Sequence, residues 1–181
     1  TDVKNNALAE IAKAIRQRSD EIIAANRQDL AEAQKNNLAA PLLKRLKFDE
    51  GKINQTVAGI ESLIKLNDPV GKTLAATELD AGLELYKVSC PIGVIGVVFE
   101  SRPDALVQIS TLCLKSGNAV LLKGGSEAAK TNCILAETIA KASEKAGLPK
   151  GWIQLLQTRQ DVAEMLALDE SIDLVIPRGS N

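Results

Sequence analysis

Hydrophobic residues recur along this chain at two different spacings. Up to residue 71 they recur every three or four positions, as in amphipathic helices that bury one face. From residue 91 onward, short apolar runs rich in β-branched side chains alternate with further helical patterns. Runs of this kind are typical of strands that are buried on both faces of a parallel sheet. The pattern therefore predicts a helical front section followed by an α/β section.

The front section is predicted to contain a series of helices that ends in a turn. The first helix is expected to bury one face, which comprises Leu8, Ile11, Ala12 and Ile15. Ser19 is expected to cap the second helix and Asp49 the last one, because short polar side chains accept hydrogen bonds from first-turn N–H groups. The section ends at Asn67-Asp68-Pro69-Val70-Gly71, whose residues favour a turn.

Residues 72–90 differ from the sections on either side. Apolar and polar residues alternate from Leu83 to Val88, directly after a turn at Asp80-Ala81-Gly82. This pattern predicts a two-stranded ribbon with one packed face and one exposed face. Because an isolated ribbon is only marginally stable in water, we expect it to contact the chain's own sheet or a second subunit.

The α/β section is predicted to contain four strands, at 92–98, 119–122, 152–156 and 172–176. Strands that alternate with helices at this spacing form right-handed crossovers and a parallel sheet. We therefore predict an α/β fold with a Rossmann-like parallel sheet that has helices on both faces. The chain then divides into three segments, at 1–71, 72–90 and 91–181.

Four polar turns follow the predicted strands and meet at the carboxyl edge of the sheet, where open α/β sheets bind ligands. They are 99–103, 123–127, 157–158 and 177–181.

The turn Lys123-Gly124-Gly125-Ser126-Glu127 begins a predicted helix, which Ser126 is expected to cap. Its glycines allow a ligand to approach the backbone, and a helix N-terminus favours an anion. Lys123 adds a cation, while Ser126 and Glu127 add groups that bind ribose hydroxyls. The turn fits neither the GxGxxG pattern nor the Walker A pattern. A capped helix start with a solvated lysine is the alternative interpretation, and the spacing alone does not decide between the two.

Two further turns carry an arginine, Glu100-Ser101-Arg102-Pro103 and Pro177-Arg178-Gly179-Ser180-Asn181. Arginine is well suited to bidentate binding of phosphate or carboxylate groups. In the alternative interpretation, Arg102 is a surface residue paired with Glu100 or Asp104, and the second segment is a plain turn.

Composition narrows the classes of partner. The chain has 22 basic and 23 acidic residues, so neither nucleic acid nor an anionic membrane is expected as a partner. Its apolar runs are too short to cross a bilayer, and residues 1–30 do not resemble a signal peptide. The absence of histidine excludes a Ser-His or Cys-His pair within this sequence, as well as histidine-ligated metal. No metal site is expected.

The sequence contains three cysteines, which are its candidate thiol nucleophiles. Their spacing matches neither a zinc site nor a redox pair, so reduced thiols and a cytoplasmic location are the simplest interpretation. Cys113 and Cys133 lie on apolar helix faces and are expected to fill the core. Cys90 is not expected to be a nucleophile, because it has no histidine to activate it.

Three motifs resemble the γ-glutamyl phosphate reductase family, a divergent branch of the aldehyde dehydrogenase superfamily. They are PIGVIGVVFESRPDAL, LLKGGSEA and IDLVIPRGSN. The resemblance covers essentially the whole chain, including the front helices and the ribbon. FESRPD is its most specific part, because ordinary aldehyde dehydrogenases carry Pro-Trp-Asn at this turn. That difference argues against an ordinary NAD-dependent aldehyde dehydrogenase.

The resemblance implies an activity and its ligands. The reaction is the NADPH-dependent reduction of L-glutamate 5-phosphate to L-glutamate 5-semialdehyde in proline biosynthesis, with release of phosphate. A cysteine thiolate displaces the phosphate to form a thioester, which hydride then reduces. The cofactor residues would be Lys123, Gly125, Ser126, Glu127, Gly179 and Ser180. The substrate-side residues would be Ser101, Arg102 and Arg178.

The resemblance also implies what this sequence lacks. The family's catalytic cysteine lies downstream of the IPRGSN segment, so we expect no catalytic residue here and interpret the chain as the cofactor-binding N-terminal half of the enzyme. A homo-oligomer formed through the 77–88 ribbon and an association with glutamate 5-kinase are further expectations. The alternative is a non-catalytic dinucleotide-binding or assembly module with the same fold.

Overall fold

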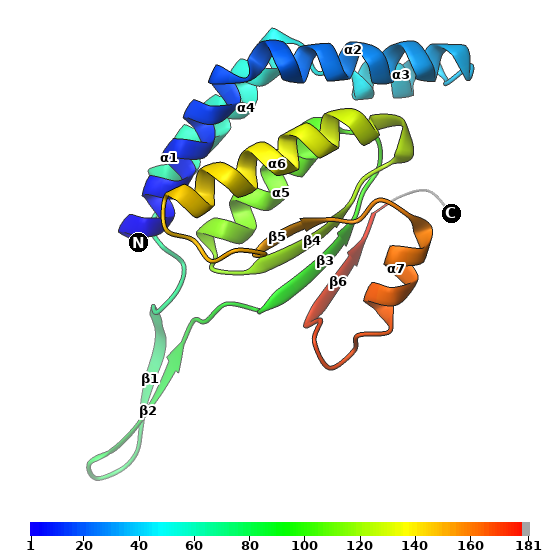
Figure 1. Cartoon of the computed structure of the whole chain (residues 1–181). Coiled ribbons are helices and arrows are strands. Elements are labelled where there is room, and N and C mark those ends of the chain that lie inside the picture. The colour runs from blue at the N-terminus through cyan, green and yellow to red at the C-terminus, as the bar shows by residue number, and fades with distance from the viewer. Residues whose placement is uncertain (179–181) are drawn as a thin grey trace.

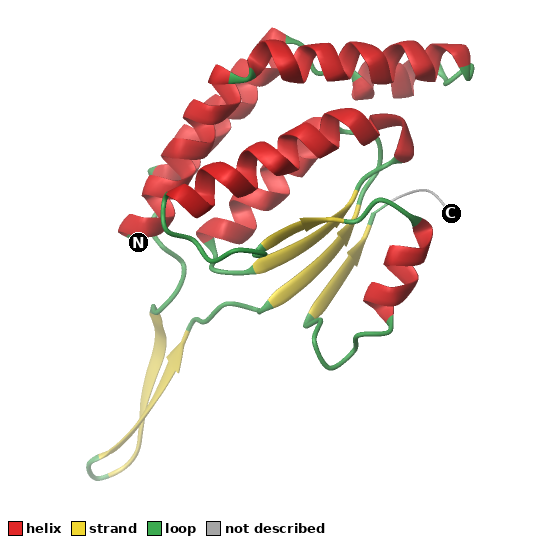
Figure 2. Cartoon of the chain, in the orientation of Figure 1, coloured by secondary structure: helices red, strands yellow, loops and turns green. Residues whose placement is uncertain are grey.

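The computed structural model describes residues 1–178, which form stacked layers of helices on a small parallel sheet (Figure 1). The outer layer consists of α1 (Asp2–Gln17), α2 (Ser19–Lys35), α3 (Ala40–Leu46) and α4 (Glu50–Ile64). The inner layer consists of α5 (Pro103–Lys115) and α6 (Ala129–Lys145), which lie between the outer helices and the sheet (Figure 2). None of the helices within residues 1–178 is long and apolar enough to cross a membrane.

The sheet is parallel and has the strand order β5-β4-β3-β6. Its strands are β3 (Val94–Val98), β4 (Ala119–Lys123), β5 (Ile153–Leu155) and β6 (Leu174–Pro177). In the register, Ile95 pairs with Val120 on one side and with Leu174 on the other. The predicted α/β fold with a parallel sheet is therefore confirmed.

Helices cover the two faces of the sheet unequally. On one face, Leu106 of α5 and Ile139 of α6 join Leu122 of β4 in the main core. The other face carries α7 (Arg159–Leu166), which lies on the side of the sheet away from α5 and α6 in Figure 1. Met165 of α7 packs so closely on Gly96 of β3 that a Cβ atom at Gly96 would lie 2.7 Å from the Met165 sulfur.

The strand order reverses at β3. The chain passes from β3 to β4 and β5 on one side, then returns through α7 to β6 on the other side of β3. Open α/β sheets bind ligands in the crevice at such a reversal, beside the carboxyl ends of the strands. The crevice between β3 and β6 is therefore a place to look for a site.

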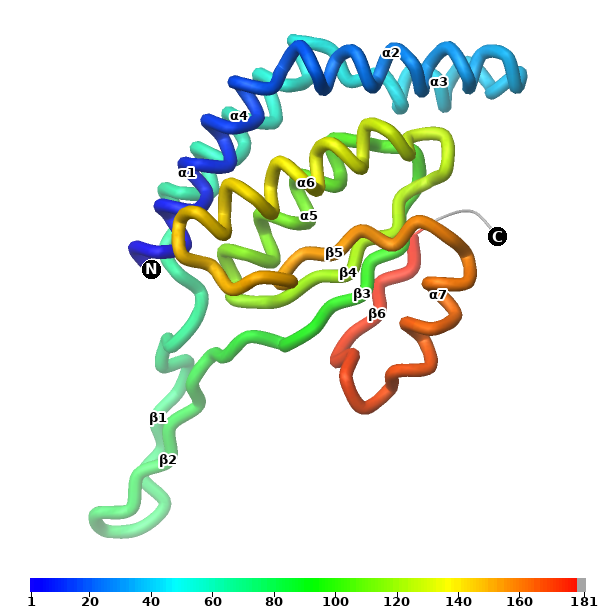
Figure 3. The backbone as a smooth tube through the Cα atoms, viewed as in Figure 1, coloured from blue at the N-terminus to red at the C-terminus, as the bar shows by residue number. Residues whose placement is uncertain are grey.

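The ribbon of β1 (Thr73–Asp80) and β2 (Leu83–Val88) projects away from the layers (Figure 3). Every residue of both strands is exposed, so neither face of the ribbon packs on the chain's own sheet, and packing on a second subunit stays a prediction. The alternation of apolar and polar residues from Leu83 to Val88 is therefore not matched by an alternation of buried and exposed residues within residues 1–178.

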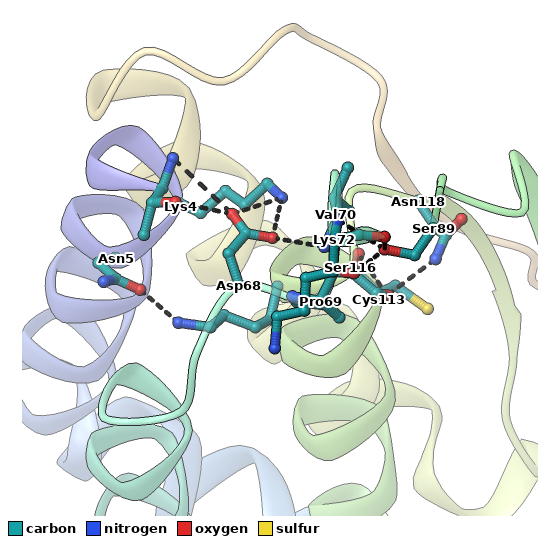
Figure 4. A network of polar contacts seen from close by, with 12 residues as sticks. Lys4, Asn5, Asp68, Pro69, Val70, Lys72, Ser89, Cys113, Ser116 and Asn118 are labelled. Carbon is teal, nitrogen blue, oxygen red and sulfur yellow. Dashed lines mark hydrogen bonds and ion pairs between the residues drawn. The ribbon is translucent and has the colours of Figure 1, made fainter. Parts of the chain in front are cut away.

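A polar network fixes the base of the ribbon to the helices (Figure 4). The Asp68 carboxylate accepts hydrogen bonds from Lys4 Nζ at 2.9 Å and from the Val70 N–H at 3.0 Å. These bonds hold the pKa of Asp68 well below its usual value. Directly after β2, Ser89 Oγ donates to the Pro69 carbonyl at 2.6 Å. The ribbon is thus anchored at its base, while within residues 1–178 its two strands contact mainly each other.

Two of the predicted helix caps differ in outcome. The Asp49 side chain accepts a hydrogen bond from the Lys52 N–H, so its role as the cap of α4 is confirmed. Ser19 is the first residue of α2 and does not cap it, since Arg18 occupies the cap position and makes no side-chain cap bond. The chain passes from α1 to α2 through this one residue, which leaves no room for a separate capping turn.

Candidate functional site

The carboxyl edge of the sheet carries two separate cavities. One lies beside the ends of β4 and β5, and the other lies beside the ends of β3 and β6. The turns at 99–103, 123–127 and 157–158 all lie at this edge as predicted, but they divide between the two cavities.

The first cavity, called here the 123–133 pocket, has a volume of about 370 Å³. It brings the 123–126 turn together with the segment 155–158. Small-molecule sites commonly occupy about 300–1,000 Å³, so a nucleoside-sized group fits. The pocket is lined by Lys123, Gly124, Gly125, Ser126, Ala129, Lys130, Asn132, Cys133, Leu155, Leu156, Gln157 and Thr158.

Three of the predicted cofactor residues line this pocket. They are Lys123, Gly125 and Ser126. Lys123 Nζ donates to the Gly124 carbonyl at 2.7 Å, so the ammonium group folds over its own turn. Glu127 lies beside the pocket, where its carboxylate covers Gly125 and accepts a hydrogen bond from Ser126 Oγ at 3.4 Å. Gly179 and Ser180 lie outside the described residues.

The helix start at this pocket differs from the prediction. Ser126 begins a short 3-10 turn, η1 (Ser126–Ala128), and α6 begins after it at Ala129, without a side-chain cap from its own cap residue. Ser126 is therefore not the cap of the long helix. The physical reason lies in α2, because a buried carboxylate from that helix already occupies the first N–H groups of α6.

That carboxylate belongs to Asp29, a residue that is only 3% exposed. It accepts hydrogen bonds from the Lys130 N–H at 3.2 Å, from the Thr131 N–H at 2.8 Å and from Thr131 Oγ1 at 2.6 Å. Asn26, one helical turn earlier, donates to Thr131 Oγ1 and to the Leu46 carbonyl. The Asp29 carboxylate thus compensates the positive end of α6. An anion in this pocket would therefore be bound by Lys123, Lys130 and the η1 turn rather than by the first turn of α6.

The pocket contains an unsatisfied buried group. Asn132 is 2% exposed, and its Oδ1 atom has no hydrogen-bond partner within residues 1–178. A Cβ atom at Gly124 would lie 2.3 Å from Asn132 Nδ2, so only glycine leaves room for this amide. Buried polar groups are rarely left unpaired. An orphaned acceptor, a glycine cradle and two lysines fit the hydroxyl and phosphate groups of a dinucleotide.

The second cavity, called here the arginine hollow, has a volume of about 130 Å³. Two predicted substrate-side residues, Arg102 and Arg178, meet there, and α3 adds Arg45, which the sequence analysis missed. Ser101, the third predicted residue, is buried at the turn and lines none of the cavities described here. The hollow is lined by Arg45, Phe99, Glu100, Arg102, Ala105 and Arg178.

Arg102 has a carboxylate partner, as the alternative interpretation expected. Its Nη2 donates to Asp104 Oδ2 at 2.8 Å, and its Nε donates to Asp104 Oδ1 at 3.4 Å. These bonds raise the pKa of Arg102 above its usual value, so the guanidinium is always charged. The pairing holds Arg102 in place beside the hollow.

A third cavity, the α4–α5 groove, adjoins the hollow through Arg102. It has a volume of about 500 Å³ and lies between α4 and α5. Apolar side chains such as Ile60, Leu63 and Val107 line its wall. Near the starts of α4 and α5, Lys52 Nζ lies 3.9 Å from the Asp104 carboxylate, and Arg102 lines the groove beside them. The groove therefore offers charges of both signs at one end and an apolar wall along its length.

None of the three cysteines lines the arginine hollow or the α4–α5 groove. Cys113 is buried, and burial raises its pKa to about 11, so its thiolate is disfavoured. Cys133 is exposed beside the 123–133 pocket, so the prediction that it fills the core is wrong. Cys90 is exposed near the base of the ribbon.

Comparisons with known proteins agree with the resemblance seen in the motifs. A gamma-glutamyl phosphate reductase from Pelotomaculum thermopropionicum is 68% identical over 181 residues, which is 100% of this chain and 42% of that relative. A relative of the same name from Acetivibrio thermocellus is 66% identical over the same shares. The chain thus spans about two fifths of the length of the curated relatives it matches.

Solved structures show the same likeness in three dimensions. The gamma-glutamyl phosphate reductase from Thermotoga maritima superposes with a TM-score of 0.93 at 36% identity, over 98% of this chain and 43% of that one. An acetylating aldehyde dehydrogenase from Geobacillus thermoglucosidasius, at 16% identity and a TM-score of 0.68, shares the fold over 96% of this chain and 36% of that one. The profile of the aldehyde dehydrogenase family matches residues 3–181. This chain therefore belongs to the aldehyde dehydrogenase family.

Proposed function

We propose that this chain is the cofactor-binding half of an enzyme that reduces L-glutamate 5-phosphate to L-glutamate 5-semialdehyde, with release of phosphate, in proline biosynthesis. The observation that carries the proposal is the pairing of two cavities on one sheet edge. A nucleotide-sized pocket lies beside β4 and β5, and a cluster of arginines lies at the strand reversal beside β3 and β6. The shared name of the relatives supports the same reaction.

The 123–133 pocket would hold the adenosine end of NADPH, which supplies hydride when bound. Lys123 and Lys130 provide positive charge for a ribose phosphate, and Ser126 provides a hydroxyl. The second lysine is the reason to propose NADPH rather than NADH, because it places an additional cation where the 2′-phosphate would add negative charge. Lys130 already pairs with Glu32 on the outer helix layer, which keeps its position defined.

The α4–α5 groove would hold the amino-acid part of the substrate. L-Glutamate 5-phosphate carries a carboxylate, an ammonium group and a phosphate. Lys52 and Arg102 can bind the carboxylate, and Asp104 can bind the ammonium group, because all three line the same end of the groove. We assign no catalytic residue to this chain, since Cys113 is buried with a raised pKa and Cys133 and Cys90 line neither the hollow nor the groove.

The ribbon would pair with a second copy of the chain. Its exposed large hydrophobic residues need cover, and the network around Asp68 fixes its base. We also propose the division into segments 1–71, 72–90 and 91–181, a cytoplasmic location where the three free cysteines stay reduced, and a functional association with glutamate 5-kinase, which would supply the acyl phosphate.

Alkylation of the cysteines tests the cofactor proposal directly. The 181-residue chain is treated with iodoacetamide at several NADPH concentrations, and the rate at each cysteine is measured by mass spectrometry. We expect saturating NADPH to slow alkylation of Cys133 by about fivefold or more, because Cys133 lines the pocket. Cys90 is exposed and distant, so its rate is the internal control, and buried Cys113 should react slowly throughout.

Two outcomes would contradict the proposal. An unchanged Cys133 rate at millimolar NADPH would remove the cofactor role of the pocket and favour a non-catalytic assembly module with this fold. Equal protection by NADH and NADPH would remove the proposed role of the second lysine in cofactor choice. The variant Lys130→Gln separates these cases, because it should weaken protection by NADPH more than protection by NADH.

A further inference from the structure

The arginine hollow gathers cations from three distant parts of the chain. Arg45 comes from α3, Arg102 from the start of α5, and Arg178 from the end of β6. Arg178 is held there by its backbone, whose N–H donates to the Val98 carbonyl at 2.9 Å. Convergence of three arginines on one small space requires the tertiary fold, because no two of them share an element.

The carboxylates near the hollow leave donors available. A guanidinium has five N–H groups. Asp104 occupies the Nε and Nη2 edge of Arg102, and Glu100 accepts from Nη1 of Arg45 at 3.3 Å. Each carboxylate thus fixes one edge of an arginine and leaves N–H groups for a second acceptor. Glu100 is the one carboxylate that lines the hollow itself, so the three arginines exceed the acidic lining within the described residues.

The backbone adds to the positive field of the hollow. It lies at the N-terminus of α5, a helix whose cap position makes no side-chain hydrogen bond, and Ala105 of the first turn lines it. Pro103 has no N–H, and the Ala105 N–H donates to the Arg102 carbonyl at 2.9 Å, so the backbone contributes mainly through the helix dipole, whose positive end favours an anion there. The volume of about 130 Å³ is too small for a nucleotide and suits a tetrahedral anion.

We propose that the arginine hollow is the site of the phosphoryl group, and that Arg45 is one of the residues that bind it. The inference rests on the proposed function, since it assigns to the hollow the 5-phosphate of the acyl phosphate and the inorganic phosphate that leaves. Arg102 lines both the hollow and the α4–α5 groove, so a substrate that bridges them places its phosphate in the hollow and its amino-acid end in the groove.

The test is a titration of the 181-residue chain with inorganic phosphate, by calorimetry, at constant ionic strength. We expect Arg45→Gln to raise the Kd for phosphate by about tenfold or more, because it removes a charge-assisted hydrogen bond. Arg45→Lys keeps the charge but loses the planar fork, so it should fall between Arg45→Gln and the parent. Thermal unfolding of each variant verifies that it is folded.

Arg16→Gln is the matched control. The Arg16 side chain is 55% exposed and pairs with Glu61 at 2.8 Å, and the Arg45 side chain is likewise 55% exposed and pairs with a glutamate. Arg16 lines none of the cavities described here. Its substitution should leave the Kd for phosphate within about twofold, since an exposed charge at a distance is screened by salt.

A second measurement, with NADPH, distinguishes a site for the substrate phosphate from a site for a dinucleotide phosphate. Arg45→Gln should leave the protection of Cys133 by NADPH within about twofold. An equal loss of NADPH protection would mean that the hollow binds a dinucleotide phosphate, which overturns the inference. It is also overturned if phosphate does not bind the parent chain, or if Arg16→Gln weakens binding as much as Arg45→Gln. Arg45-dependent phosphate binding without NADPH protection of Cys133 supports the hollow and contradicts only the cofactor proposal.

Discussion

Of the helices that begin at the carboxyl edge of the sheet, α6 and α7 have first turns that are stabilised in opposite ways. At α7, Thr158 Oγ1 accepts from the Asp161 N–H at 3.0 Å, and the Asp161 carboxylate accepts from the Thr158 N–H at 3.0 Å. At α6, the cap residue is an alanine, and the carboxylate that bonds the first turn comes from Asp29 on another helix. One helix start is local and exposed, whereas the other depends on the packing of α2.

The difference matters for the 123–133 pocket, because both helix starts border it. The first turn of α7 can form from local contacts alone, because Thr158 and Asp161 are close in the sequence. The α6 start, together with Lys130 and Asn132, takes its final arrangement only when α2 has docked. Ligand binding at this pocket is therefore coupled to the helical front section, even though no residue of α2 lines it.

Replacement of Asp29 should give the largest effect. Asp29→Ala removes three hydrogen bonds from a buried carboxylate and leaves two first-turn N–H groups without a partner. We expect the free energy of unfolding in urea to fall by about 2–4 kcal/mol. Asp20→Ala, at an exposed position of the same helix, is the control and should cost less than about 1 kcal/mol. Equal stability of Asp29→Ala and the parent would show that α6 does not need the distant cap.

The same contrast explains which features the sequence could predict. The Thr158 and Asp161 box is a local feature, because its two side chains lie three residues apart in the sequence. Asp29 left a weaker signal, since the buried face of α2 contains Ile22, Asn26, Asp29 and Ala33 at helical spacing, with polar residues in the middle. Two polar side chains within an apolar stripe indicate a buried network, although they do not identify its partner.

The site was predictable to a similar extent. Lys123, Gly125, Ser126, Arg102 and Arg178 follow strands directly, so the parallel fold brings them to one edge without further information. Arg45 belongs to a short helix more than fifty residues from Arg102, and its sequence neighbours give no reason to place it at the sheet. Its contribution depends on how the outer layer docks, which periodicity does not determine.

Replacement of Thr158 should give a smaller effect than that of Asp29. Thr158→Ala removes an exposed cap and should lower the free energy of unfolding by about 1 kcal/mol, in the usual range for such caps. Thr158→Ser retains the hydroxyl and should recover most of the loss. A cost for Thr158→Ala as large as that for Asp29→Ala would remove the distinction between the local and the distant cap.

Acid should produce the smallest effect and should act on the α7 start. The hydrogen bonds to Thr158 lower the pKa of Asp161 from 3.8 to about 2. Because the folded pKa lies below the unfolded one, the carboxylate contributes its stabilisation fully above about pH 4 and loses it as the pH falls toward 2. The protection factors of the Thr158 and Gln157 amides, which both donate to Asp161, should therefore fall over this interval and not between pH 7 and 5, when each exchange rate is compared with the intrinsic rate at the same pH. Asp161→Asn carries no titrating group, so the protection factors of these amides should show no transition between pH 4 and 2. A transition of the same size in Asp161→Asn would assign the acid sensitivity to another group and leave the box without its proposed role.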